Sequence, residues 1–278
     1  MRSASSRLSP TLLAAVPVFV FLVVPTAIVV PMALNQSRYI TFPPDNFSFD
    51  AVTGFLGDPG WTSAVLASLQ AAGIAVTLAV LLGGSAAVAL HGRRFPGLSA
   101  ASGVILAPMI VPPIVLALGF YQFFNSVGLV GTILPIGLAH AVIATPYTFL
   151  TVRASLSGLN PALVRSAQSL GAGVVSVARF VYLPVIRPGL IAGALFAFAV
   201  SIDETVISLF LQSPSATTLP VKMFTDIQYN LTPEIAVSSA MLVTIATLGL
   251  LVQIFFMLRR RSIARMLPLT TVAPDQTG

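Results

Sequence analysis

Residues 165–184 read RSAQSLGAGVVSVARFVYLP, a polar stretch that carries two glycines and two arginines. Long apolar segments precede and follow it, so it forms a loop between two segments that have the composition of membrane helices. A loop of this length with helix-forming residues suggests a docking element for a soluble partner. The alternative is that the loop lies on the lipid headgroups, with its arginines in contact with anionic lipid.

The loop is predicted to contain a short helix, a glycine bend and a second helix. Asn160 is a good N-cap residue, and Pro161 suits the first helical position. Three apolar residues recur at helical spacing and would share one face: Leu163, Ala167 and Leu170. Gly171 is placed to end this helix as its C-cap. A second helical segment, 174–183, is expected to end at Pro184 and to lead into the next apolar span.

The composition of the chain identifies lipid as its solvent. Hydrophobic residues make up 56% of the sequence, charged residues only 8%, and the mean hydropathy is +0.96. A soluble domain cannot cover its surface with so few charges. The absence of cysteine excludes disulfides and thiolate metal sites. The net charge of +6 does not indicate a nucleic-acid partner, because the arginines lie in short loops beside apolar runs.

The hydropathy pattern predicts an all-α integral membrane protein with six transmembrane helices. Each apolar stretch is long enough to span the roughly 30 Å hydrocarbon core. The six stretches are residues 10–34, 62–90, 100–124, 129–152, 189–212 and 235–258. The first is longer than the hydrophobic region of a signal peptide, so we expect it to remain as an uncleaved helix. We assign residues 1–268 to one transmembrane domain, with the loop at 153–188, and 269–278 to a disordered tail.

The basic residues predict the orientation of these spans. Twelve of the fourteen cations fall on one side: Arg2, Arg7, Arg93, Arg94, Arg153, Arg165, Arg179, Arg187, Arg259, Arg260, Arg261 and Arg265. The opposite side carries only Arg38 and Lys222 together with most of the carboxylates. Because cations in short loops mark the cytoplasmic side, both termini are expected in the cytoplasm.

An acidic pair lies inside the fifth predicted span. Asp203 and Glu204 are the only carboxylates within a span, and such residues usually face a bundle interior or a water-filled cavity. If the pathway carries a cation, this pair is the expected attractor, with the hydroxyls of Ser201 and Thr205 beside it and Tyr121 as a cation–π partner. The alternatives are a structural hydrogen bond at a kink, pairing with a charge on a partner, and, for Tyr121, the interfacial aromatic belt.

The loop residues resemble those of a known family. Permease subunits of binding-protein-dependent ABC importers carry a motif of Glu-Ala-Ala, three residues, Gly, nine residues, an aliphatic residue, any residue, Leu and Pro. The matching positions are Ala167, Gly171, Val181, Leu183 and Pro184, with Arg165-Ser166 in place of Glu-Ala. Residues 199–208, together with 219–220, 42–44 and 47–48, are similar to the second permease of spermidine/putrescine transporters.

This resemblance implies a type I ABC importer permease fold in which the loop forms coupling helices on an ATP-binding subunit. It implies contacts to that subunit from Arg165, Ser166, Ala167, Leu170, Gly171, Leu183 and Pro184. The implied partners are a second permease or another copy of this chain, two ATPase subunits, a periplasmic binding protein and the lipid bilayer of the bacterial inner membrane, with no nucleic acid. The implied cargo is a small solute such as a polyamine.

The chain has no phosphate-binding loop of its own. That motif requires a lysine after a glycine, and the single lysine, Lys222, follows Val221. The two histidines, His91 and His140, lie far apart in the sequence and offer no hydrolytic site. No cofactor, metal or catalytic residue is expected on this chain, and ATP with Mg²⁺ would bind the partner ATPase. The competing hypothesis is a secondary transporter or channel driven by an ion gradient, with Asp203 and Glu204 as the ion relay. The docking loop argues against it, because such proteins need no soluble ATPase.

Overall fold

The computed structural model describes residues 10–35, 42–44, 46–93, 95–229 and 231–266. By its internal contacts the chain divides into two units, residues 1–241 and 242–278. The predicted tail at 269–278 and the cations Arg2, Arg7, Arg38 and Arg94 lie outside the described residues. All sites discussed below belong to the first unit.

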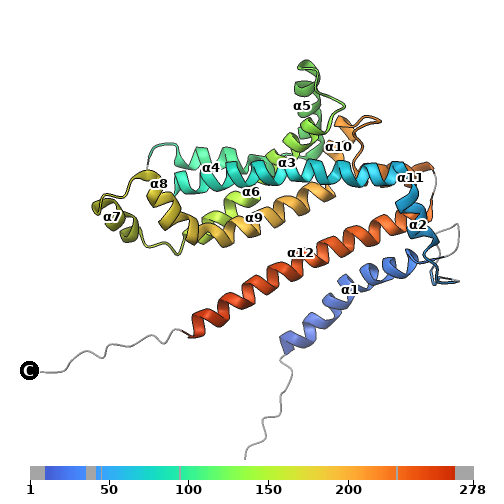
Figure 1. The fold of residues 1–278 in the computed structure, drawn as a ribbon, viewed down its shortest axis with the longest axis horizontal. Coiled ribbons are helices and arrows are strands. Elements are labelled where there is room, and N and C mark those ends of the chain that lie inside the picture. Colours follow the sequence, from blue (N-terminus) through green and yellow to red (C-terminus); the bar gives the residue numbers. More distant parts are fainter. Residues whose placement is uncertain (1–9, 36–41, 45, 94, 230, 267–278) are drawn as a thin grey trace, which may run out of the picture. The chain divides into compact units, whose positions relative to one another are not determined.

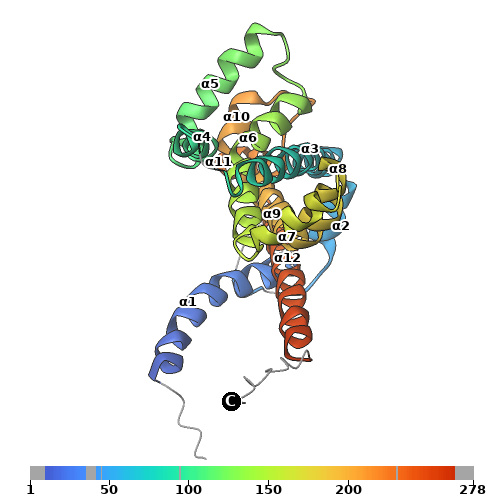
Figure 2. The same cartoon turned by 90° about the vertical axis from the view of Figure 1, so that its left-hand side faces the viewer.

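Helices dominate the described part of the chain (Figures 1 and 2). In chain order they are α1 (Pro10–Met32), α2 (Asp50–Gly57), α3 (Pro59–Leu90), α4 (Leu98–Leu106), the 3-10 helix η1 (Ala107–Met109), α5 (Pro113–Ser126), α6 (Ile133–Leu156), α7 (Pro161–Ser169), α8 (Val174–Val177), the π-helix η2 (Ala178–Tyr182), α9 (Leu183–Asp203), α10 (Val206–Leu211), α11 (Leu219–Tyr229) and α12 (Pro233–Met266). Among these residues the only β-pairing is an isolated bridge between Asn35 and Phe47. The all-α prediction is confirmed.

Small residues bring α3, α6 and α9 together, and these helices run side by side in Figure 1. One face of α3 carries a buried stripe of alanine and glycine: Ala64, Ala67, Ala71, Ala75, Ala79, Gly83 and Ala87. A methyl group built on Gly83 would lie 2.7 Å from the carbonyl oxygen of Thr145 on α6. Such residues allow close approach of helix backbones in lipid, where packing rather than the hydrophobic effect holds helices together.

Two glycines on α9 make the same kind of contact with α6. A methyl group on Gly189 would lie 2.6 Å from the carbonyl oxygen of Thr151, and one on Gly193 would lie 2.9 Å from the Cα of Thr148. The spacing Gly189-xxx-Gly193 predicts close helix packing, with a partner permease as one possible neighbour. The structure shows that the neighbour is α6 of the same chain.

The third predicted span, 100–124, is not a single helix. Its two parts, 98–109 and 113–126, differ in direction by 97°. Pro113 disfavours a helical conformation at the preceding residue, and Pro112 is accordingly extended, with φ −55° and ψ 135°. Neither proline has an amide hydrogen to continue the helical ladder. The chain therefore breaks sharply at these prolines, and α5 packs on α10 rather than extending α4.

Three helical segments are long and apolar enough to cross a membrane among the residues that could be searched: 59–90, 133–156 and 174–203. The bent pair of α4 and α5 counts as a fourth if it is one span. A multi-pass membrane protein follows from these segments. The count of six spans and the cytoplasmic location of both termini stay predictions.

Candidate functional site

The helix α7 begins and ends where the sequence indicates. The Asn160 side chain accepts a hydrogen bond from the amide of Ala162 at 2.9 Å, and Pro161 is the first helical residue. At the other end, Gly171 has φ +85°, a left-handed conformation that glycine adopts without strain. The amide of Ala172 donates to the carbonyl of Ala167, and that of Gly171 to the carbonyl of Gln168. This pair of bonds is a Schellman cap, so the Ala–Gly spacing of the motif has a local structural cause.

The surface of α7 is open along most of its length. None of its residues is buried, and the side chains of Leu163 and Leu170 are 57% and 88% exposed. Only Val164 packs against a core cluster, which includes Phe149 and Val152 of α6. The predicted apolar face is therefore mostly unpartnered within the described chain, as expected both for a surface that contacts a protein partner and for one that lies on lipid headgroups.

The second part of the loop adds apolar side chains that the motif does not name. Val174, Val175 and Phe180 are each more than 70% exposed. The pair of valines directly after Gly173 was the available sequence signal for them. All seven residues expected to contact an ATPase are exposed or half-exposed: Arg165, Ser166, Ala167, Leu170, Gly171, Leu183 and Pro184.

The expectation that the second helix ends at Pro184 is wrong. Residues 174–203 form one helical segment, in which α8 passes through η2 directly into α9. In η2 the amide of Leu183 donates to the carbonyl of Ala178, five residues earlier. This widened turn comes immediately before Pro184, whose missing amide would interrupt a regular ladder. The fifth helix therefore starts well before residue 189, and its first turns belong to the loop.

The acidic pair lies at a break in the fifth span rather than inside a continuous helix. α9 ends at Asp203, Glu204 is extended with φ −74° and ψ 111°, and α10 begins at Val206. The fifth predicted span, 189–212, is therefore not one continuous helix. No proline or glycine marks this break. The signal in the sequence was the polar run Asp-Glu-Thr, whose side chains can bond to nearby backbone in place of helical partners.

The two carboxylates have different surroundings. The Oε1 atom of Glu204 accepts a hydrogen bond from the amide of Ile207 at 2.9 Å and so caps the start of α10. Asp203 is exposed and has no ion-pair partner, since the only ion pair among the described residues joins Lys222 to Asp226. The Thr205 hydroxyl lies 3.4 Å from the carbonyl oxygen of Asp203. Asp203 is thus the more exposed carboxylate of the pair.

A buried histidine connects the two sides of this break. His140 of α6 has no exposed surface, and its Nδ1 and Nε2 atoms lie 2.8 Å and 3.0 Å from the hydroxyls of Ser201 and Ser208. One serine precedes the break and the other follows it. His140 therefore makes an interhelical contact that joins α6 to both sides of the break. The Ser201 hydroxyl is buried in this contact, so Ser201 would affect a substrate pathway only indirectly.

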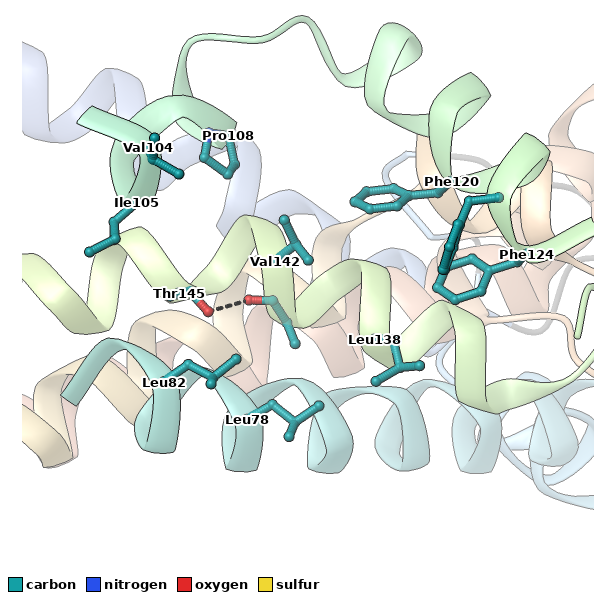
Figure 3. Close-up of a pocket in the computed structure, with 12 residues that line it drawn as sticks. Leu78, Leu82, Val104, Ile105, Pro108, Phe120, Phe124, Leu138, Val142 and Thr145 are labelled. Atoms are coloured by element: carbon teal, nitrogen blue, oxygen red, sulfur yellow. Dashed lines mark hydrogen bonds between the residues drawn. The ribbon is translucent and has the colours of Figure 1, made fainter. Parts of the chain in front are cut away.

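Tyr121 is 40% exposed on α5 and has no hydrogen bond to either carboxylate in the described structure. Its neighbours Phe120 and Phe124 line an apolar cavity of about 450 Å³, together with side chains from α3, α4 and α6 (Figure 3). The single hydroxyl in this cavity, that of Thr145, donates to the carbonyl of Ala141 in its own helix at 2.7 Å. No charged side chain of the described residues lines the cavity, so its lining does not suit an ammonium group.

Known proteins have similar sequences. The family model of the binding-protein-dependent transport system inner membrane component matches residues 79–266. The spermidine/putrescine transport system permease protein PotC of Haemophilus influenzae is 31% identical over 238 residues, which cover 85% of this chain and 92% of that protein. The putrescine transport system permease protein PotI of Escherichia coli K12 is 33% identical over 224 residues, covering 78% of this chain and 79% of that protein.

Solved structures share the fold. A chain of a bacterial ABC transporter involved in the import of the acidic polysaccharide alginate superposes with a TM-score of 0.66, covering 92% of this chain and 98% of that chain at 16% identity. A chain of an amino acid ABC transporter gives a TM-score of 0.53 at 21% identity and covers 73% of this chain and 97% of that chain. The family match and the similarity to PotC show that this chain belongs to the binding-protein-dependent transport system inner membrane components, the permease subunits of ABC importers.

Proposed function

We propose that this chain is the translocation subunit of an ATP-driven importer that moves a polyamine, such as spermidine or putrescine, into the cytoplasm. The observation that carries the proposal is the exposed apolar surface of α7, which has no partner within the described chain. Family membership and the polyamine permeases among the relatives support it.

The packing of the loop supports a mechanical role. Val164 of α7, Val181 of η2 and Ile186 of α9 belong to the same cluster as Phe149 and Val152 of α6. The Schellman cap at Gly171 fixes the end of α7 by two hydrogen bonds, and only Ala172 and Gly173 separate this cap from the segment 174–203. If an ATPase displaced α7, the movement would therefore be transmitted to α6 and α9, which pack on α3. In this proposal Arg165, Ser166, Ala167, Leu170, Gly171, Leu183 and Pro184 form the contact.

The end of α9 supports a cationic cargo. The last carbonyls of a helix carry partial negative charge, and the Asp203 carboxylate is exposed at this end of α9. Thr205 and Tyr121 also belong to the proposed substrate pathway. Ser201 contributes to the pathway indirectly, because its buried hydroxyl contacts His140. An ammonium group gains more from this arrangement than a neutral or anionic solute does.

The proposed assembly contains a second permease or another copy of this chain, two ATPase subunits and a periplasmic binding protein that delivers the polyamine. ATP and Mg²⁺ bind the ATPase subunits, so this chain is non-catalytic. It lies in the bacterial inner membrane with both termini in the cytoplasm, and alternating exposure of the cavity between the permeases moves the cargo.

The deciding experiment is co-purification from the native membrane in a mild detergent, followed by identification of the bound subunits. The wild-type chain should recover an ATPase and a second permease or another copy of itself. The variant Leu163→Asp/Leu170→Asp should lose the ATPase, because two charges replace exposed apolar contacts without disturbing a core. The matched control is Leu56→Asp/Leu231→Asp, which changes two exposed leucines on the predicted opposite side.

Two results would contradict the proposal at different levels. Recovery of the ATPase by Leu163→Asp/Leu170→Asp at the wild-type level would show that α7 is not the contact. Recovery of the wild-type chain alone, together with uptake by the isolated protein in vesicles under an ion gradient, would exclude an ATP-driven importer.

A further inference from the structure

A second cavity lies where α3, α4 and α6 meet at the predicted cytoplasmic side. It has a volume of about 220 Å³ and is lined by His91 and Arg93 after α3, Ser102 of α4, and Phe149 and Arg153 of α6. Hydrogen-bond donors and positive charge thus converge on a small concave space. Neither the loop motif nor the acidic pair involves any of these residues.

The charge facing this cavity is not neutralised by the described part of the chain. Neither guanidinium has a carboxylate partner among the described residues. The Arg153 guanidinium carbon lies 5.9 Å from the centre of the Phe149 ring, which also lines the cavity. The sequence places no carboxylate in the predicted cytoplasmic loops, and Asp275 of the tail is the single acidic residue on that side. Two cations at one cavity favour an anion there, and arginine matches phosphate geometry well.

The basic cavity and the apolar cavity lie along the same face of α6. On α6, Leu138, Val142 and Thr145 line the apolar cavity, and Phe149 and Arg153 line the basic one. These positions recur every three or four residues, so they form one stripe about 22 Å long.

The neighbouring helix α4 also contributes residues to both cavities. On α4, Val104 and Ile105 face the apolar cavity, and Leu98 and Ser102 face the basic one. Figure 3 shows Val104 and Ile105 at this end of the apolar cavity. A soluble phosphate would need only the basic part. A phospholipid would use both parts, with its headgroup at the arginines and an acyl chain along the apolar stripe.

We propose that His91, Arg93 and Arg153 bind the phosphate of one anionic phospholipid whose acyl chain lies in the apolar cavity between α3, α4 and α6. Basic pockets between membrane helices at the cytoplasmic face bind anionic headgroups in this way. The lipid site involves neither the substrate pathway nor the α7 surface. Its test is therefore independent of the proposed function. The bound lipid would fasten the short α4 helix, none of whose residues is buried, onto α3 and α6.

The test is native mass spectrometry of the full chain, with whatever subunits co-purify, after incubation with phosphatidylglycerol or phosphatidylcholine of the same acyl chains. The wild type should retain one phosphatidylglycerol and discriminate against phosphatidylcholine. Arg93→Gln/Arg153→Gln should weaken phosphatidylglycerol retention by about tenfold or more. The control Arg179→Gln/Arg187→Gln removes two exposed arginines of the same predicted face that do not line the cavity, and it should behave as wild type.

A second variant separates a lipid from a soluble phosphate. Val104 is 74% exposed in this structure, so Val104→Asn is compatible with folding. It should weaken phosphatidylglycerol retention and leave binding of glycerol 3-phosphate unchanged. Two results together would overturn the lipid assignment in favour of a soluble anion. Millimolar inorganic phosphate would displace phosphatidylglycerol, and Val104→Asn would leave phosphatidylglycerol retention unchanged. Equal phosphatidylglycerol retention by Arg93→Gln/Arg153→Gln and wild type would overturn the site itself.

Discussion

At the residue scale, the packing of this permease depends on positions where a single methyl group does not fit. A Cβ atom added to Gly83, Gly189 or Gly193 would lie less than 3.0 Å from atoms of α6. In lipid these contacts carry much of the helix association, because burial of apolar surface contributes little there. The tolerance of a glycine to substitution should therefore depend on its neighbour rather than on its helical location.

Gly193→Ala should destabilise the protein, whereas the matched change Gly73→Ala should not. The new methyl group at residue 193 would overlap Thr148, at a typical overpacking cost of about 1–3 kcal/mol. At Gly73, in the middle of α3, nothing lies within 4 Å, and alanine is the better helix former. Thermal unfolding in detergent measures both. A Gly193→Ala midpoint at or above that of Gly73→Ala would contradict the close α6–α9 contact.

Asp203→Asn should lower the initial rate of spermidine uptake more than Glu204→Gln does. The exposed Asp203 charge is free to attract a cation, and losing an attraction of about 1 kcal/mol at an exposed site corresponds to roughly fivefold. Glutamine at 204 can still accept the Ile207 amide and keep the cap. Uptake of radiolabelled spermidine by whole cells measures this, with Asp50→Asn as the surface control. Wild-type uptake by Asp203→Asn would remove the electrostatic role.

At the element scale, the protein combines a closely packed helical trio with helices that are interrupted. α3, α6 and α9 pack through small residues, while the third and fifth predicted spans break at Pro112-Pro113 and at Glu204. His140 holds the two sides of the second break together through Ser201 and Ser208. Interrupted helices persist in membranes where neighbouring protein satisfies the freed backbone groups. α7 is a third kind of element, short, exposed and fixed at both ends by caps.

Gly171→Val should reduce the coupling between ATP hydrolysis and transport. A β-branched residue at φ +85° costs about 1–3 kcal/mol, so the Schellman cap that fixes the end of α7 would be lost or shifted. Gly173→Val is the matched control, because Gly173 has φ −69° and no atom within 4 Å of an added methyl group. Reconstituted vesicles with the ATPase give the ratio of ATP hydrolysed to polyamine transported. Equal ratios for the two variants would contradict the role of this bend.

At the scale of the whole molecule, the arrangement of charge predicts how the chain crosses the bilayer. The chain contains no cysteine, so single cysteines can report orientation without a background. Ser169→Cys on α7 should react with a membrane-impermeant maleimide only after the cells are opened, whereas Ser215→Cys, exposed between α10 and α11, should react in cells with a permeable outer membrane alone. The reverse pattern would place α7 on the periplasmic side and exclude contact with a cytoplasmic ATPase.

The sequence by itself determined the all-α membrane class, the family and the local structure of α7. Each rests on short-range causes: apolar length, the Asn160 and Gly171 caps, and the motif spacing that the Schellman turn explains. Only the tertiary structure decided that Gly189 and Gly193 face α6, that the segment from Val174 passes Pro184 as one helix, and that Asp203 is free while Glu204 is a cap. These outcomes depend on which distant residues meet, and periodicity along one helix does not specify its neighbour.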